Sequence, residues 1–145
     1  MDKDNTQGGT GYVIVSVGGA GGAIPLSDAI VRIFEYSPDS SSQNGKLIAT
    51  LKTDRSGKSE KIPLPAPPRS SSLYPGGGKS FSTYNIDAYL EGYYPQQYIN
   101  VPIFDGVTAI QNINLIPIAE NGRESITYDT RFFETENQFL GQGGA

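Results

Sequence analysis

Seven short segments of the chain are rich in β-branched and aromatic residues, and each is bounded by residues that favour turns. In the segment 84–90, hydrophobic and polar side chains alternate, so that Tyr84, Ile86, Ala88 and Leu90 share one face. This period of two is the pattern of a half-buried strand. The seven predicted strands are 12–17, 29–36, 47–53, 59–64, 84–90, 97–104 and 108–116.

No segment shows a 3.6-residue hydrophobic period long enough for a helix. Seven short strands separated by turn signals are typical of an all-β, seven-stranded Greek-key β-sandwich. In the strand 29–36, hydrophobic residues fall on both faces near its middle, which predicts burial on two sides. In the strand 108–116, Ile110, Asn112, Asn114 and Ile116 oppose Gln111, Ile113 and Leu115.

The connections between these strands carry recognisable turn chemistry. Asn44-Gly45 is a strong turn dipeptide, and 53–58 is expected to be a tight turn in which Asp54 caps the backbone. Gly57 is the residue expected to take the left-handed conformation. The glycine cluster 18–22 matches neither a phosphate-binding loop nor a helix start, and is interpreted as a flexible connection after the first strand.

The stretch 63–82 is unusually rich in proline, with Pro63, Pro65, Pro67, Pro68 and Pro75. Proline removes a hydrogen-bond donor, so this stretch is not expected to form an interior strand. It is predicted to be a long, extended crossover between two strands.

These elements divide the chain into three parts. Residues 1–11 are predicted to be a flexible polar arm, residues 12–118 the β-sandwich domain, and residues 119–145 a polar C-terminal tail. Within the tail, 126–133 is a mixed segment that is able to add one more strand. The arm has no apolar stretch like that of a signal peptide, and no apolar run approaches the length that spans a bilayer.

Composition excludes several chemistries. The chain has no histidine and no cysteine, which removes His-dependent nucleophile pairs and the usual zinc, iron and copper ligand sets. The net charge of −4 argues against a nucleic-acid partner, which would require clustered Lys and Arg. Because the chain has no cysteine, no disulfide pattern indicates whether the protein works in an oxidising or a reducing compartment, and its localisation stays unknown.

Candidate catalytic residues are few. Glu60, Asp87 and Glu91 are carboxylates, but nothing in the sequence places two of them at the separation a glycosidase needs, so solvated faces are the preferred interpretation. The turn 53–57 lacks the further carboxylates of a calcium loop. We therefore expect no catalytic residues, no metal site and no cofactor, and expect that the chain is not an enzyme.

Four tyrosines gather around one turn: Tyr89, Tyr93, Tyr94 and Tyr98. Aromatic side chains at the end of a sandwich stack on sugar rings or anchor a protein interface. The alternative is that some pack in the core and the others cover the turn, so both interpretations stay open. These four residues are the predicted ligand or partner contacts.

Three features together resemble the transthyretin-like, or carboxypeptidase-regulatory-like, domains. They are the strand entry Ile24–Ile33, with Pro25 and Ala29; the turn 53–58; and the alternating strand that ends in Glu91-Gly92-Tyr93-Tyr94. The resemblance extends from Tyr12 to Pro117. Related surface domains form a crosslink from a lysine on the first strand, and related hydrolases use a histidine; this chain lacks both, so neither property is carried over.

The segments 64–67, 103–107 and 111–117 are also similar to an accessory domain of clostridial spore-cortex-lytic proteins. This second resemblance implies a spore or cell-envelope setting. The expected function is a non-catalytic binding or assembly module that engages a protein or peptidoglycan partner through loops and strand edges. The alternative is a structural subunit or stalk domain that self-assembles by strand addition from its terminal arms, as a homo-oligomer.

Overall fold

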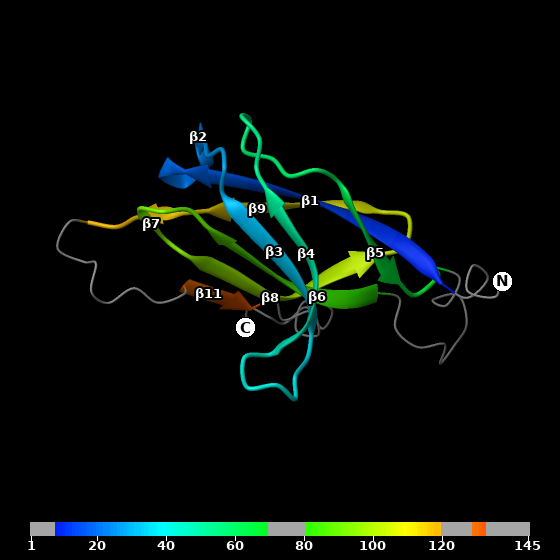
Figure 1. The fold of residues 1–145 in the computed structure, drawn as a ribbon. Helices are drawn as coiled ribbons and strands as arrows, with labels where there is room; N and C mark the ends of the chain where they lie inside the picture. The colour runs from blue at the N-terminus through cyan, green and yellow to red at the C-terminus, as the bar shows by residue number, and fades with distance from the viewer. Residues whose placement is uncertain (1–7, 70–80, 120–128, 133–145) are drawn as a thin grey trace, which may run out of the picture.

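A computed structural model describes residues 8–69, 81–119 and 129–132 of the chain. In these residues the fold is all-β, with eleven strand segments, no α-helix and one 3-10 turn at Ala20–Gly22. Two larger sheets pack face to face as a β-sandwich, and a two-stranded ribbon lies at one end (Figure 1).

The first sheet, sheet A, is built around one long strand, β1 (Gly9–Gly19). On one side, β1 pairs antiparallel with β5 (Ile62–Ala66) along its first half and with β2 (Ile24–Pro25) at its end. On the other side it pairs parallel with β9 (Thr108–Asn114). Among the described strands, β1 is therefore the link that joins the other three strands of this sheet.

The second sheet, sheet B, has five strands in the order β11-β8-β6-β3-β4. The pairs β3–β4, β3–β6 and β6–β8 are antiparallel, whereas β8–β11 is parallel. A small ribbon joins β7 (Tyr93–Tyr94) to β10 (Ile116–Pro117). The bounds of the five strands are β3 (Ile30–Tyr36), β4 (Asn44–Lys52), β6 (Phe81–Tyr89), β8 (Gln96–Phe104) and β11 (Asp129–Phe132).

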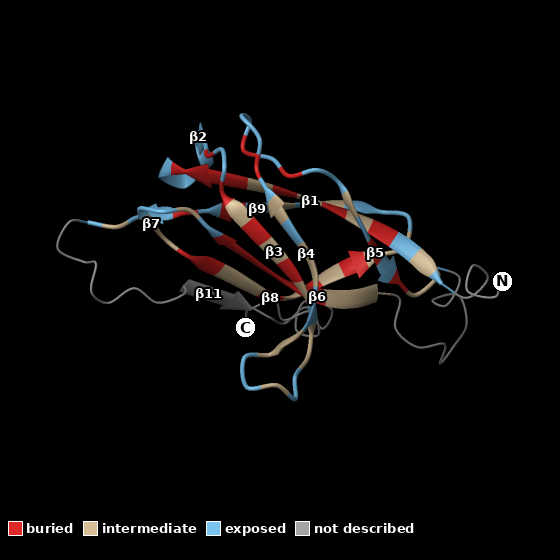
Figure 2. Cartoon of the chain, viewed as in Figure 1, coloured by how far each residue is buried: buried red, intermediate tan, exposed pale blue. Residues whose placement is uncertain are grey.

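The hydrophobic core lies between the two sheets (Figure 2). Alternate residues of each strand point into it, as the pleat of a strand requires. From β1 these are Val13, Val15 and Val17, which are at most 1% exposed. The other buried members of the core come from both sheets and from the β2–β3 connection: Leu26, Ala29, Val31, Ile33, Leu64, Ala66, Tyr84, Ile86, Ala88, Val101, Ile103, Ile113 and Leu115.

A β-bulge changes the direction of the side chains halfway along β8. Tyr84 pairs with Val101 and Ile86 pairs with Tyr98, so β8 has one residue more than β6 between these pairs. Asn100 absorbs the extra residue with a φ of 72°. As a result Tyr98 and Val101 both pack against the core, although they are three positions apart.

Each of the seven predicted strands overlaps one strand of five or more residues, and the structure adds four shorter strands in the described residues. Two bounds differ. Strand β1 already begins at Gly9, inside the segment predicted as an arm. Residues 1–7, 120–128 and 133–145 lie outside the described residues, and β11 falls within the tail segment 126–133.

The prediction for the proline-rich stretch is partly wrong. Pro63 and Pro65 lie inside β5, which occupies residues 62–66 where the sequence predicted a strand over 59–64. The physical reason is that β5 is an edge strand, paired only with β1. Two prolines at alternate positions direct both nitrogens to the same side, where an edge strand needs no donor. Of the predicted crossover, 70–80 lies outside the described residues.

The prediction of burial on both faces of the second strand is also only partly right. Val31 and Ile33 are fully buried in the core, but Ile30 and Phe34 on the opposite face are only partly buried. Sheet B faces the other sheet on one side only. The second face is instead covered in part by the polar contacts described below.

The turn between β4 and β5 follows the predicted chemistry. Asp54 accepts hydrogen bonds through Oδ1 from the amides of Ser56 and Lys58, at 2.9 and 3.0 Å. Gly57 has a φ of 78°, and a Cβ at this position would lie 2.6 Å from the carbonyl oxygen of Val17. The turn is thus held against β1, whose Val17 amide donates to the Gly57 carbonyl at 2.7 Å.

Thr53 generates a prediction about stability. Its buried hydroxyl donates to the Leu26 carbonyl at 2.7 Å and accepts from the Ala29 amide at 3.0 Å. The substitution Thr53→Val keeps the shape of the side chain but leaves both backbone groups unsatisfied. We expect a loss of about 1–3 kcal/mol in the free energy of unfolding, measured by denaturant titration.

The matched control is Thr50→Val, three residues earlier on β4, where the side chain is exposed. That change is expected to alter stability by less than about 0.5 kcal/mol. Equal effects of the two substitutions would contradict the role assigned to the Thr53 hydroxyl.

Candidate binding site

The four predicted contact tyrosines do not share one surface. Tyr98 and Tyr93 pack against the core, and Tyr94 pairs with Ile116 in the β7–β10 ribbon. These three lie near the C-terminal end of β9: Tyr93 and Tyr94 pair with the short strand β10 just after it, and Tyr98 lines a pocket together with Asn112 and Asn114. Tyr89 is 48% exposed at the end of β6, on the outer face of sheet B. The structure therefore groups three of the four and separates the fourth.

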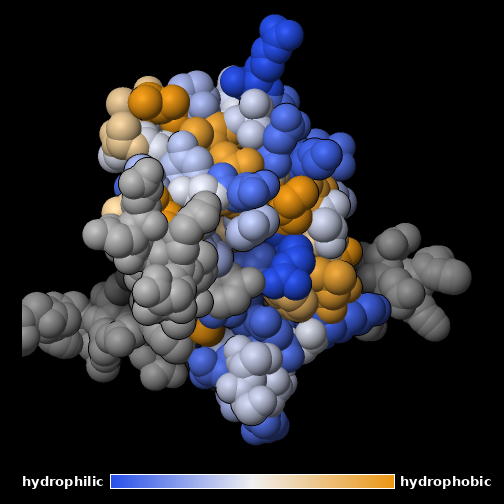
Figure 3. Space-filling view, turned by 60° about the vertical axis from the view of Figure 1, so that its left-hand side comes forward, coloured by the Kyte–Doolittle hydropathy of each residue, from blue (hydrophilic) through white to orange (hydrophobic). Residues whose placement is uncertain are grey.

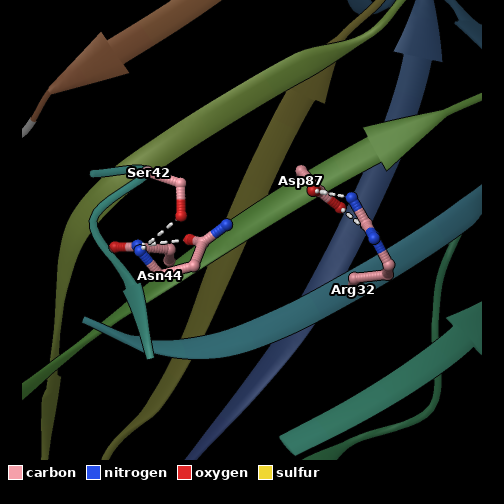
Figure 4. Close-up of polar contacts among 5 residues, drawn as sticks. Arg32, Ser42, Asn44 and Asp87 are labelled. Atoms are coloured by element: carbon pink, nitrogen blue, oxygen red, sulfur yellow. Dashed lines mark hydrogen bonds and ion pairs between the residues drawn. The ribbon is translucent and has the colours of Figure 1, made fainter. Parts of the chain in front are cut away.

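The three candidate carboxylates lie in different places. Glu60 lines an open groove of about 410 Å³ beside β4, together with Lys52 and Lys58, and Glu91 is exposed in the turn before β7. Asp87 differs from the expected solvated side chain, because it is buried on the outer face of sheet B. Figure 4 shows its carboxylate facing Arg32 of the neighbouring strand β3.

Arg32 forms a two-pronged ion pair with Asp87. The Arg32 Nε lies 3.1 Å from Asp87 Oδ1, and a terminal guanidinium nitrogen lies 2.7 Å from Oδ2. The guanidinium also sits over the ring of Phe34, 5.1 Å from its centre. A bidentate geometry of this kind fixes both side chains. Asp87 is thus occupied by a structural contact.

Asn85, which the sequence did not single out, organises the same face. Its amide nitrogen donates to the Gln43 carbonyl at 2.7 Å and to Asn44 Oδ1 at 2.6 Å. Its amide oxygen accepts from the Asn100 backbone amide at 3.0 Å. One buried side chain therefore joins the β3–β4 loop to the bulge of β8; part of that loop, with Ser42 and Asn44, is drawn in Figure 4. The sequence offered one signal for this role, because Asn85 is a polar residue in the middle of the alternating segment 84–90.

A polar pocket of about 440 Å³ opens beside the ends of β1 and β9. Its walls include Ser16, Gly22, Asn112 and Asn114, with Tyr98 and Ile113 among the remaining residues, and no lining side chain is charged. Asn114 Oδ1 accepts from the Gly22 amide at 3.1 Å and so holds the 3-10 turn at the rim. Neutral hydroxyl and amide groups of this kind bind uncharged polar ligands.

The open edge of β9 is the other notable surface. The Tyr12 amide donates to the Val107 carbonyl at 2.9 Å, and the Leu115 amide donates to the Gly18 carbonyl at 2.8 Å. Odd-numbered residues of this segment therefore point their backbone groups toward β1. Since these groups alternate along a strand, those of Thr108, Ile110, Asn112 and Asn114 point away from β1.

None of the described residues pairs with this outward edge of β9. One outward carbonyl, that of Asn112, accepts a local bond of 3.1 Å from the Gln111 side chain. The side chain of Ile110 is 55% exposed. Val107, just before β9 in the sequence, is 47% exposed, and Ile116, just after it, is 42% exposed. The edge thus combines backbone groups that no described strand pairs with and exposed apolar side chains.

Two other edge strands, β4 and β5, carry features that block strand addition. Strand β5 contains Pro63 and Pro65, and β4 contains Lys46 and Lys52 together with two shifts of register against β3. Prolines, lysines and bulges on edge strands prevent pairing with another chain. Strand β9 contains neither proline nor lysine, and residues 106–119 contain no charged residue at all. On the face drawn in Figure 3, hydrophobic residues form separate patches among hydrophilic ones.

Asp105 fixes the turn that leads into β9. Its carboxylate accepts from the Arg69 amide at 2.9 Å and from the Thr10 amide at 3.1 Å. The hydrogen bond from the Arg69 amide, followed by that from Thr10, lowers the pKa of Asp105 below its ordinary value of 3.8. The start of β1, the end of the β5 segment and the β8–β9 turn therefore meet at one carboxylate.

The described residues contain no group of three or more His, Cys, Asp or Glu side chains placed to hold a metal ion. The part of the chain that the structure covers also has no helix long and apolar enough to cross a membrane.

No protein-family model and no curated protein matches the sequence. Among solved structures, the catechol 1,2-dioxygenase of an Acinetobacter species is similar, with 12% identity and a TM-score of 0.53. The catechol 1,2-dioxygenase of Acinetobacter radioresistens has 15% identity and a TM-score of 0.54. Both similarities cover 90% of this chain, which spans 60% of the length of those enzymes.

A minor pilin of Streptococcus agalactiae is 17% identical, with a TM-score of 0.47 over 77% of this chain and 46% of the pilin. A likeness at that level supports no argument about function. The dioxygenase comparisons show that this chain shares a β-sandwich fold with enzymes.

The comparisons correct one expectation. The sequence led us to expect that the chain is not an enzyme, partly because a β-sandwich suggested a binding module. The same type of sandwich occurs in catechol 1,2-dioxygenases, so that prediction is contradicted. The physical reason is that a fold supplies a scaffold, whereas activity depends on the side chains placed upon it.

Asp105 generates a pH-dependent prediction. A carboxyl whose pKa is lowered by folding stabilises the protein above its ordinary pKa of 3.8, and this contribution is lost as the pH falls through the lowered pKa. We expect Asp105→Asn to lower the melting temperature at neutral pH, with the difference from wild type shrinking in strong acid. Asp39→Asn in the exposed β3–β4 loop is the control. A difference that stays constant with pH would contradict this assignment.

Proposed function

We propose that this chain is a β-sandwich module that binds a protein partner by accepting an extended strand at the open edge of β9. The observation that carries the proposal is the contrast among the edges. Strands β4 and β5 carry residues that block pairing, whereas β9 presents unpaired backbone groups and the exposed side chain of Ile110. Backbone bonds to an added strand supply affinity, and alternate side chains supply specificity.

The cellular setting of the proposal follows from the resemblances described above. We place the module in a spore- or cell-envelope-associated assembly, on a transthyretin-like, seven-stranded Greek-key sandwich. Tyr93, Tyr94 and Tyr98 lie near the end of β9 and are proposed to contact the partner there. Tyr89 would contact a partner separately, on the outer face of sheet B.

The alternative of a structural subunit that donates its terminal arms stays a prediction. It concerns residues 1–7 and most of 119–145, which lie outside the described residues. Both versions require strand addition, but they differ in which strand is added and which edge receives it.

The proposed edge is tested by one charged substitution. We expect Ile110→Lys to weaken the binding of extended peptides selected against the wild-type chain from a displayed peptide library. A lysine on an edge strand disfavours an added strand, and we expect affinity to fall by at least about tenfold, which corresponds to 1.4 kcal/mol. Titration calorimetry with the selected peptides measures the change.

The matched control is Ile24→Lys, because Ile24 is 54% exposed, close to the 55% of Ile110, but lies on β2. Peptides that bind the Ile110→Lys variant as tightly as the wild type would refute strand addition at β9.

A second candidate function is glycan binding in the pocket of about 440 Å³, and it keeps peptidoglycan among the proposed partners. Its support is the uncharged lining, in which Ser16, Asn112 and Asn114 offer hydroxyl and amide groups. Tyr98 adds an aromatic side chain to the same pocket. Sugars are bound by combinations of such polar and aromatic groups.

This second candidate predicts that Asn112→Asp weakens co-sedimentation with peptidoglycan sacculi by about tenfold, since a carboxylate loses the two donors of the amide. Ser41→Asp, in the exposed β3–β4 loop, adds the same charge away from the pocket and is the control. If wild-type protein does not sediment with sacculi, or if the two variants behave alike, the glycan candidate is rejected.

A further inference from the structure

We infer that the strand that completes sheet A is β9 of a second copy of this chain, paired antiparallel across a two-fold axis at Ile110. This inference rests on the proposed function, because it names the partner of the same edge. It commits to one occupant, a second copy, and to one register.

The shape of the sandwich leaves a place for this strand. Strand β9 follows β8 through a short turn and passes from sheet B to sheet A. Sheet B continues past β8 with β11, but among the described strands nothing continues sheet A past β9. A strand added to β9 would therefore extend sheet A at an edge that no described strand occupies.

The distribution of charge along the chain makes the β9 segment the surface at which a second copy meets the least repulsion. The chain has a net charge of −4, so two copies brought together at random surfaces repel one another. The β9 segment is an exception, because residues 106–119 are all uncharged. Two copies that meet along this segment place no like charges opposite each other, which is a requirement for a stable pair of strands.

The order of residues along β9 favours the antiparallel register at Ile110. An isologous two-fold contact pairs a residue with itself, and its neighbours with each other in reverse order. With Ile110 on the axis, the two exposed isoleucines meet, and Thr108 of each copy lies opposite Asn112 of the other. All three residues point their backbone groups outward, so each pair exchanges hydrogen bonds as in an antiparallel ladder.

The absence of cysteine from the chain makes the test clean, because one introduced cysteine is then unique. Directly opposed residues in a hydrogen-bonded antiparallel pair have Cα atoms about 5.5 Å apart, within the range that a disulfide spans. We expect full-length Ile110→Cys to form a disulfide-linked dimer under mild oxidation. Ile24→Cys, with a matched exposure of 54%, is expected to form it at least about tenfold more slowly, because no contact raises its effective concentration.

A measurement on the unmodified chain guards against misfolding of the variants. In wild type, hydrogen exchange at the amides of Ile110 and Asn112 is expected to slow as protein concentration rises through the dimerisation range seen by analytical ultracentrifugation. The inference is overturned if the chain stays monomeric at all concentrations, or if Ile110→Cys crosslinks no faster than Ile24→Cys.

The result separates this inference from the function on which it rests. A monomeric chain that still loses peptide binding on Ile110→Lys would reject the second copy and keep strand addition to another protein. A dimer whose formation is unchanged by Ile110→Lys would reject β9 as the contact between copies.

Discussion

Sheet A depends on the backbone hydrogen bonds of β1, because β2, β5 and β9 all pair with β1 and, in the described part of the chain, not with one another. Along one edge, β1 is bonded in turn by β5, by Ser59 and Gly57, by Leu26 and by β2. Along the other edge it is bonded by β9. Its alternate valines face the core, so the same residues that hold the sheet also bury its inner face. Loss of β1 would leave β2, β5 and β9 without the strand with which they pair and would remove three buried valines from the core.

Local patterns in the sequence were sufficient to predict the main strands and the residues that stabilise some of the turns. The alternation at Tyr84, Ile86 and Ala88 identified the core face of β6, because a strand repeats every two residues. The role of Gly57 followed from its place after Asp54 in a tight turn, and its φ of 78° agrees. The bounds of β5 were missed, because proline is tolerated on an edge and the sequence does not say which strands are edges.

The contacts that the sequence did not predict depend on which strands pair with one another. Asn85 joins the β3–β4 loop to Asn100, and Asp87 meets Arg32, only because β6 lies beside both β3 and β8. Four tyrosines close in sequence were separated by the path of the chain, with Tyr89 left on the outer face of sheet B. The uncharged stretch around Ile110 was visible in the sequence, but its meaning depends on β9 being an edge. Fold class likewise left catalysis undecided.

The extra residue in β8 also limits how this chain tolerates changes in length. Before Asn100, the even-numbered residues Gln96 and Tyr98 face inward; after it, the odd-numbered Val101 and Ile103 do so. Deleting Asn100 itself would restore regular alternation and keep Tyr98 and Val101 facing the core, but it would remove the amide that donates to Asn85. Deleting a residue elsewhere in the strand, such as Gln97, would turn over the residues before it and direct Gln96 away from the core. Changes in the length of β8 are therefore tolerated at the bulge and in the neighbouring turns, and not in the regular part of the strand.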